Sequence, residues 1–272
     1  MLGIVGTVPD ADLGLLHGPA RLDGGRVTVA GRELEVQRGT PALLAAALQV
    51  AAHLGRPEIH AYLAGDTGRG DGSRHLYDWL CRHLPDCTCS VLVFHYLQPD
   101  VDWHGRVLLA IEQMTRPPVL IADAGFMYAA KMSGQAGRYD CFTPDLGELA
   151  FLADEQAPHP FYTRGFILHE SNRADDLIER AYRHDNAAIH LLVKGATDAI
   201  VARGRVVDRV DAPSTPAMEA IGGTGDTLTG LLAALCAAGH DLVPAASLAA
   251  RANRLCGALA RPTPASPVSE LI

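Results

Sequence analysis

The chain has 272 residues, 48% of them hydrophobic and 20% charged, so it can bury a large core without disulfides or a structural metal. Its formal net charge is -8, and the absence of a basic patch excludes a nucleic-acid polymer as partner. An acidic protein can still bind a nucleotide at one focal site. We find no repeat, low-complexity stretch or linker, and we expect a single domain over residues 1–272.

The start of the chain and the cysteines bear on the compartment. Residues 1–6 contain neither a basic leader nor a long apolar run, so we expect a cytoplasmic protein without a membrane anchor. The six cysteines are expected to be free thiols, and their spacing is not that of a zinc site. The sequence leaves homo-oligomerisation open.

Strands and helices are predicted to alternate along most of the chain. The expected strands are 2–5, 27–29, 34–36, 58–64, 91–96, 119–122, 166–168, 188–193, 199–202 and 206–210. The expected helices are 41–54, 74–83, 101–114, 143–152, 174–183, one that follows the glycines at 222–225 and ends at Gly239, and 244–260, with a loop over 153–165. In the last helix we expect Leu248, Leu255 and Leu259 to face inward, and we expect Thr40 to cap the helix at 41–54. Unbroken apolar strands between helices predict an α/β fold with a parallel sheet covered on both faces.

The most informative stretch is Gly-Gly-Thr-Gly-Asp at 222–226, followed by an apolar helical pattern. A helix N-terminus presents unpaired N–H groups and a positive dipole end, and glycines let a ligand come close, so this turn predicts an anion site. The carboxylate of Asp226 would repel a phosphate, but it can take a proton from an attacking hydroxyl. The alternative is that Asp226 only caps the helix.

Residues 217–226 resemble the signature of the ribokinase-like superfamily. The resemblance implies a three-layer sandwich with a mostly parallel central sheet and helices on both faces. It also implies that Gly223, Thr224 and Gly225 form the anion hole and that Asp226 is the catalytic base. The Gly-Gly-Thr-Gly-Asp form is most similar to the branch of ADP/ATP-dependent NAD(P)H-hydrate dehydratases, long labelled carbohydrate kinases.

Four positions in the first half of the chain are candidate substrate contacts by this resemblance. Asp12 follows the first strand, Gly39 precedes a helix, Asp66 lies in a glycine-rich loop and Asp123 ends a strand. Ligands of such sheets bind beyond the carboxyl ends of the strands. The alternatives are a solvated loop acid for Asp12 and simple turns for the loop around Asp66.

Asp145 and Glu148 lie three residues apart at a strand-to-helix junction, where two carboxylates could hold Mg²⁺ against a nucleotide phosphate. Acids in a first turn also complement the helix dipole, which is the alternative. The pair resembles Asn-x-x-Glu of the kinases, with Asp145 in place of Asn. It also resembles Thr-Pro-His-x-Gly-Glu of the dehydratases, with Asp145 in place of His, and this difference favours a kinase.

The nucleotide is expected beside Lys194, Gly195 and Thr197, because a Lys and a Gly at a strand end suit contact with phosphate. The run resembles the Lys-Gly segment of the superfamily, and by the same resemblance Asn253 of the last helix is a nucleotide contact. A solvated lysine and polar packing of Asn253 are the alternatives.

The leading hypothesis is a ribokinase-like sugar-type kinase that transfers the γ-phosphoryl group of ATP, with Mg²⁺, to a hydroxyl of a small molecule, with Asp226 as base. One alternative is an NAD(P)H-hydrate dehydratase, a lyase that uses ATP or ADP on the same fold. Another is a non-catalytic nucleotide-binding protein. The expected partners in each case are a nucleotide and a small-molecule substrate.

Overall fold

The structure is a computed structural model that describes residues 1–55, 58–156 and 174–272. Its centre is an 11-stranded sheet in the order β11-β10-β9-β8-β7-β6-β1-β5-β2-β3-β4. The strands are β1 Leu2–Val8, β2 Leu15–Asp23, β3 Arg26–Val29, β4 Arg32–Leu34, β5 Ile59–Gly65, β6 Val91–His95, β7 Val119–Ala122, β8 Cys141–Phe142, β9 His190–Val193, β10 Asp198–Ala202 and β11 Arg205–Val210. The predicted strand at 166–168 and part of the predicted loop before it lie outside the described residues.

Six neighbouring strands, from β9 through β8, β7, β6 and β1 to β5, run parallel, and the strands beyond them on either side are antiparallel. β1 lies within this parallel part, with Leu2 opposite both Ile59 of β5 and Val91 of β6. Every residue of β1 and of β6 is buried, as an apolar strand covered on both faces requires. The carboxyl ends of these strands therefore meet at one edge of the sheet.

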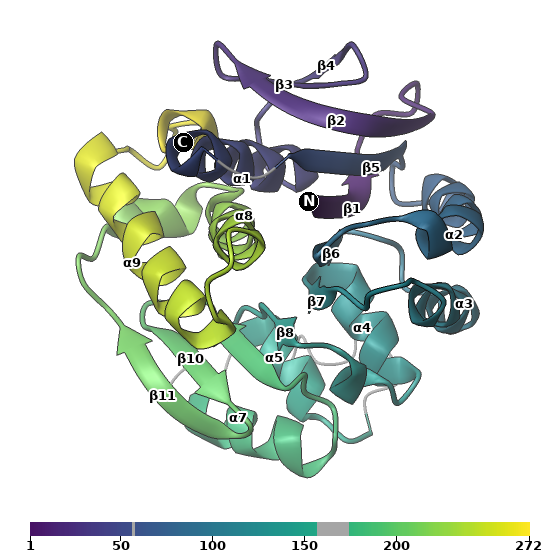
Figure 1. Cartoon of the computed structure of the whole chain (residues 1–272). Helices are drawn as coiled ribbons and strands as arrows, with labels where there is room; N and C mark the ends of the chain where they lie inside the picture. Colours follow the sequence, from purple (N-terminus) through teal and green to yellow (C-terminus); the bar gives the residue numbers. More distant parts are fainter. Residues whose placement is uncertain (56–57, 157–173) are drawn as a thin grey trace.

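Helices cover both faces of the sheet (Figure 1). They are α1 Thr40–Leu54, α2 Asp71–His83, α3 Val101–Glu112, α4 Ala124–Met132, α5 Leu146–Ala153, α7 Ala174–Arg183, α8 Thr224–Ala237 and α9 Leu242–Ala260. One hydrophobic core joins the sheet to α2, α3, α4, α5 and α7, and the other joins it to α1, α8 and α9. The expected three-layer sandwich with a mostly parallel central sheet is confirmed. Within the described part of the chain, no helix is both long and apolar enough to cross a membrane.

The antiparallel extension β2-β3-β4 differs most from the prediction. β2 was not predicted, because Gly18 and Pro19 interrupt it and most of its side chains are exposed or only partly buried. The hairpin between β3 and β4 turns through Ala30 and Gly31, both with positive φ. β4 therefore begins at Arg32 and ends at Leu34. The strand predicted at 34–36 shares only residue 34 with it.

The last helix faces the opposite way from the prediction. Leu248, Leu255 and Leu259 are 46%, 50% and 81% exposed, so the expectation that they point inward is wrong. Small residues face the core instead, because α9 lies very close to the chain before α8. A Cβ atom on Gly257 would come within 2.0 Å of the Met218 sulfur.

The start of α1 also differs from the prediction, and it bears on the site. Gly39, not Thr40, occupies the N-cap position, with φ 70° and ψ -150°, a conformation essentially restricted to glycine. Thr40 is the first helical residue and its side chain is fully buried. Its hydroxyl is thereby free to point into the sheet instead of capping the helix.

Candidate active site

The carboxyl ends of the parallel strands bring together residues that lie far apart in the sequence. His95 ends β6, Asp123 follows β7 and Lys194 follows β9. Asp226, in the first turn of α8, faces them across this edge of the sheet. This is the edge at which ligands of parallel α/β sheets bind.

The carboxylate of Asp226 is nearly buried, at 8% exposure, and is held by two residues outside its own helix. The amide of Gly39 lies 2.6 Å from Oδ2, and His95 Nε2 lies 3.0 Å from Oδ1. Burial acts to raise the pKa of Asp226, but the hydrogen bond and charge of His95, the charge of Lys194 and the Gly39 amide outweigh it and lower the pKa. Asp226 is therefore ionised at neutral pH, and it does not cap α8, whose N-cap is Gly223.

His95 belongs to the site, although no role was predicted for it from the sequence. Its side chain is fully buried, with Nδ1 3.0 Å from the hydroxyl of Thr40. That hydroxyl donates in turn to the carbonyl oxygen of Thr7, at 2.9 Å. Both ring nitrogens therefore have partners, and the contact through Nε2 fixes the position of the Asp226 carboxylate. A polar residue closing an apolar strand was the available signal.

Asp123 and Lys194 form a buried ion pair beside Asp226. Lys194 Nζ lies 3.0 Å from both oxygens of Asp123, which is 2% exposed. The hydroxyl of Thr229 and the amide of Ala124 also donate to Asp123, at 2.7 and 2.8 Å. Burial alone would lower the pKa of Lys194, but the surrounding carboxylates raise it, so the ammonium stays charged.

The ligand atoms of His95, Asp123 and Asp226 all lie within 4.8 Å of one another, close enough to suit a metal ion. The ammonium of Lys194 already supplies a positive charge to this group through Asp123. The hydrogen bonds of the three side chains account for their closeness without a metal.

Gly125, two residues after Asp123, lies where the chain packs closely against another segment. A Cβ atom on Gly125 would lie 2.0 Å from the carbonyl oxygen of Leu97. The close approach of these two segments leaves no room for a side chain.

The turn at Gly223, Thr224 and Gly225, which was predicted to form an anion hole, lies at the start of α8. Gly223 takes φ 104°, and α8 begins at Thr224. Among the described residues, no acceptor bonds the amides of Thr224, Gly225 or Asp226. The side chain of Lys194 passes 3.4 Å from the Cβ position of Gly225. Free amides, a helix N-terminus and an ammonium together fit a phosphate group.

Hydrogen bonds from Arg254 of α9 fix the backbone of segment 194–197, which follows β9. Arg254 pairs with Asp198 at 2.8 Å and donates to the carbonyl oxygens of Gly195 and Ala196, both at 3.0 Å. Gly195 and Thr197 themselves are exposed beside Lys194. The structure therefore brings these two candidate nucleotide contacts to the surface next to the anion turn.

Asn253, the third such candidate, serves a different contact in the structure. Its Oδ1 accepts from the hydroxyl of Thr227 at 2.8 Å, and its Nδ2 donates to the carbonyl oxygen of Thr224 at 3.1 Å. Asn253 of α9 thus stabilises the first turn of α8. These contacts agree with polar packing, the alternative to a nucleotide contact at this position.

Asp145 and Glu148 form a capping box at the start of α5, so the helix begins at Leu146 and not at 143. Each carboxylate accepts the other residue's amide, at 2.8 and 2.9 Å. Burial raises the pKa of Glu148 to about 8, although the charge of Lys194 acts to lower it, and Tyr128 donates to its Oε1 at 3.2 Å. The backbones of Asp145 and Lys194 pair in a parallel β-bridge, and the charge of Glu148 acts on the Lys194 ammonium.

A cavity of about 490 Å³ opens beside Gly39 and is lined by Thr7, Pro9, Arg38, Gly39, Asp66, Thr67, Gly68, Ser73, Tyr96 and Gln98. Asp66 accepts four hydrogen bonds from its own loop and the start of α2, which lower its pKa against the opposing effect of burial. Its carboxylate therefore organises the wall of the cavity. Asp12 is exposed in the turn between β1 and β2 and is not among the described residues that line the cavity.

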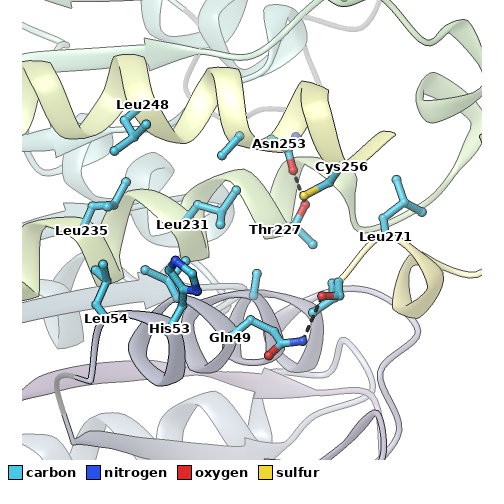
Figure 2. Close-up of a pocket in the computed structure, with 14 residues that line it drawn as sticks. Gln49, His53, Leu54, Thr227, Leu231, Leu235, Leu248, Asn253, Cys256 and Leu271 are labelled. Atoms are coloured by element: carbon cyan, nitrogen blue, oxygen red, sulfur yellow. Dashed lines mark hydrogen bonds between the residues drawn. The ribbon is translucent and has the colours of Figure 1, made fainter. Parts of the chain in front are cut away.

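A second cavity, of about 480 Å³, lies between α1, α8 and α9, away from these charged groups (Figure 2). Its walls are mostly aliphatic, with Leu54 from α1, Leu231 and Leu235 from α8, and Leu248 from α9. Neither Asp123 nor Asp226 is among the described residues that line this second cavity. The cavity beside Gly39 is connected to Asp226 through the hydrogen bond that the Gly39 amide donates to its carboxylate.

Comparison with known proteins identifies the family. The sequence model of a family described as NAD(P)H-hydrate dehydratase matches residues 98–269, more than half of the chain. An uncharacterized protein of Methanocaldococcus jannaschii is 36% identical over 231 residues, which cover 85% of this chain and 95% of that protein. The ADP-dependent (S)-NAD(P)H-hydrate dehydratase of Cenarchaeum symbiosum is 31% identical over 140 residues, 51% of this chain but only 43% of that enzyme.

Among solved structures, a ribokinase-like superfamily protein of Enterococcus faecalis is similar with a TM-score of 0.58 and 15% identity, over 99% of this chain and 83% of that one. At this identity the likeness shows the fold alone. The prediction of a sugar-type kinase is wrong, because the family match and the sequence relatives with named activities point to the dehydratases. The chain belongs to the ribokinase-like superfamily and, within it, to the NAD(P)H-hydrate dehydratase family of enzymes.

Proposed function

We propose that the protein is a hydro-lyase that removes water from hydrated NAD(P)H and consumes ATP or ADP in doing so. One observation carries the proposal: an ionised, nearly buried Asp226 faces the reaction site next to the free amides of an anion turn, in a chain of the dehydratase family. Base and anion turn together suit the activation of a hydroxyl by phosphoryl transfer.

The chemistry follows from the poor leaving ability of hydroxide. Asp226 takes the proton from the substrate hydroxyl as its oxygen attacks the terminal phosphoryl group of the nucleotide. The hydroxyl oxygen then leaves carbon as part of phosphate, and the neighbouring carbon loses a proton, so the ring double bond forms. The products are NAD(P)H, inorganic phosphate and the shortened nucleotide. The first of these steps is chemically that of a kinase, which explains why a kinase fold suits a dehydratase.

On the nucleotide side, the amides of Gly223, Thr224 and Gly225 would receive the transferred phosphoryl group. Lys194 would bind the neighbouring phosphate, and Gly195 and Thr197 would contact the nucleotide at the surface. We assign Asn253 to bracing α8, where its hydrogen bonds already lie.

Asp145 and Glu148 would hold Mg²⁺, which would screen the phosphate charges. The remaining oxygen of Asp145, Oδ2, has no hydrogen bond to a described residue, so it is available to a cation or its water. Asp145 stands where the dehydratases carry His. Its capping of α5 shows that aspartate suits the fold at this position.

On the substrate side, Gly39 would let the hydrated ring approach Asp226, since a side chain there is excluded by its backbone conformation. Asp66 and Asp123 would act indirectly, the first through the cavity wall and the second by holding Lys194. Asp12 is left without a role.

The test is the recovery of NADH absorbance from hydrated NADH, with the protein, Mg²⁺ and either ATP or ADP. The proposal predicts recovery that depends on both protein and nucleotide. Thermal stabilisation by the nucleotide without any recovery would contradict it, and would indicate a protein that binds nucleotide without this reaction.

A further inference from the structure

Tyr96, directly after His95, has a backbone conformation that a bulky residue rarely adopts. Its φ is 52°, in the left-handed region that favours glycine. The hydroxyl of Thr7 donates to its carbonyl oxygen at 2.5 Å and holds the backbone in place. A strained residue persists where the surroundings fix it, and such residues cluster at functional sites.

This backbone conformation directs the ring of Tyr96 toward Gly39 and the cavity beside it. The side chain is 50% exposed and lines the 490 Å³ cavity. Two of its ring carbons lie 3.7 Å from the Cβ position of Gly39, whose amide donates to Asp226. The ring of His95 meets it edge-on, with centroids 4.3 Å apart and planes at 71°.

Core packing does not explain this tyrosine. The hydroxyl of Tyr96 has no hydrogen bond to any residue in the described ranges, and half of its surface is open. Tyr77 makes the contrast, since it is fully buried and donates to the carbonyl oxygen of Gln98 at 2.7 Å. The protein keeps a strained, half-exposed aromatic ring directly after His95, the residue that holds the carboxylate of Asp226, although glycine at this position would relieve the backbone.

We propose that the reacting six-membered ring of the substrate stacks on the aromatic ring of Tyr96. By this contact Tyr96 selects substrates whose ring becomes planar during the reaction. The inference rests on the proposed function. In the hydrate, the carbons that carry the added hydrogen and hydroxyl are tetrahedral. Elimination makes them planar, so the ring offers a flatter face to Tyr96 as the reaction proceeds. Stacking that strengthens toward the product stabilises the transition state more than the substrate.

Three substitutions separate the ring from the backbone strain. Tyr96→Phe keeps the ring, Tyr96→Leu removes it and keeps a side chain at positive φ, and Tyr96→Gly removes both. The measurements are kcat and KM for hydrated NADH, the affinity for NADH followed by its fluorescence, and the melting temperature.

We expect Tyr96→Phe to resemble the wild type and both other variants to lose roughly 10- to 100-fold in NADH affinity and in kcat/KM. Tyr96→Gly should melt above Tyr96→Leu, because glycine accepts the left-handed conformation. If the wild-type protein is active and Tyr96→Leu keeps its NADH affinity and turnover, the stacking role of Tyr96 is refuted and the dehydratase activity is not. A wild-type protein that regenerates no NADH would overturn the dehydratase activity, and the stacking role of Tyr96 with it.

Discussion

Replacing Asp226 with asparagine is expected to lower turnover at least ~100-fold and to leave nucleotide affinity largely intact, since a general base contributes about 10²- to 10⁴-fold. This corresponds to roughly 3 to 5 kcal/mol in the activation barrier. Asparagine is nearly isosteric but cannot take the proton. The amides that would bind phosphate belong to the backbone and stay in place.

The structure also predicts a stability cost for this substitution. Both oxygens of Asp226 accept hydrogen bonds, one from Gly39 and one involving His95. The asparagine amide group would face one of these partners with the wrong polarity, at a cost of about 1–3 kcal/mol. The folded state lowers the pKa of Asp226, so its contribution is present above the unfolded pKa and is lost as pH falls. The difference in melting temperature between wild type and variant should therefore shrink below about pH 4.

The assay is steady-state recovery of NADH from its hydrate, together with nucleotide affinity from titration of thermal stability. Asp23→Asn, an exposed acid at the end of β2, is the matched control and should behave as wild type. Equal losses of affinity and turnover in Asp226→Asn would refute the role of Asp226 as base.

Three further predictions follow from contacts around the site and in the core. His95→Gln should lower kcat with little change in KM and move the acidic limb of kcat/KM to higher pH, because burial then dominates the pKa of the catalytic carboxylate; an unmoved limb would contradict this. Lys194→Met should lower the free energy of unfolding in urea by about 3–5 kcal/mol, because it leaves Asp123 buried without its cation. The double variant with Asp123→Asn should recover part of that loss, and additive losses would contradict a stabilising ion pair. Gly230→Ala should lose about 1–3 kcal/mol, since its Cβ would lie 2.3 Å from a carbonyl oxygen of α1, whereas Gly105→Ala, with no neighbour closer than 3.9 Å, should gain about 0.5–1 kcal/mol in the same assay.

The sequence was most informative where local rules and tertiary structure agree. The apolar run Val119–Ala122 was correctly predicted as a covered strand, and the glycine turn before Asp226 correctly predicted the start of a helix. The anion site at that helix start stays a prediction. Asp145 and Glu148 were found as a pair, although their spacing serves a capping box as well as a metal.

What the sequence could not show depends on contacts between distant segments. His95 reads as the end of an apolar strand until the fold brings Asp226, 131 residues away, to its ring. The inward face of α9 was predicted wrongly because leucines were expected to point to the core. The residues that do so are mostly alanines and Gly257, whose small side chains let α9 approach its neighbours closely. Asn253 lay in the expected region, but its partners on α8 are visible only in the structure.

The measurement that tests the account most directly is the amount of inorganic phosphate released for each NADH regenerated. The account predicts equal amounts, strict dependence on the hydrate, and loss of both products in Asp226→Asn. Regeneration of NADH without phosphate release, or phosphate release that does not depend on the hydrate, would contradict the claim that the nucleotide activates the leaving hydroxyl.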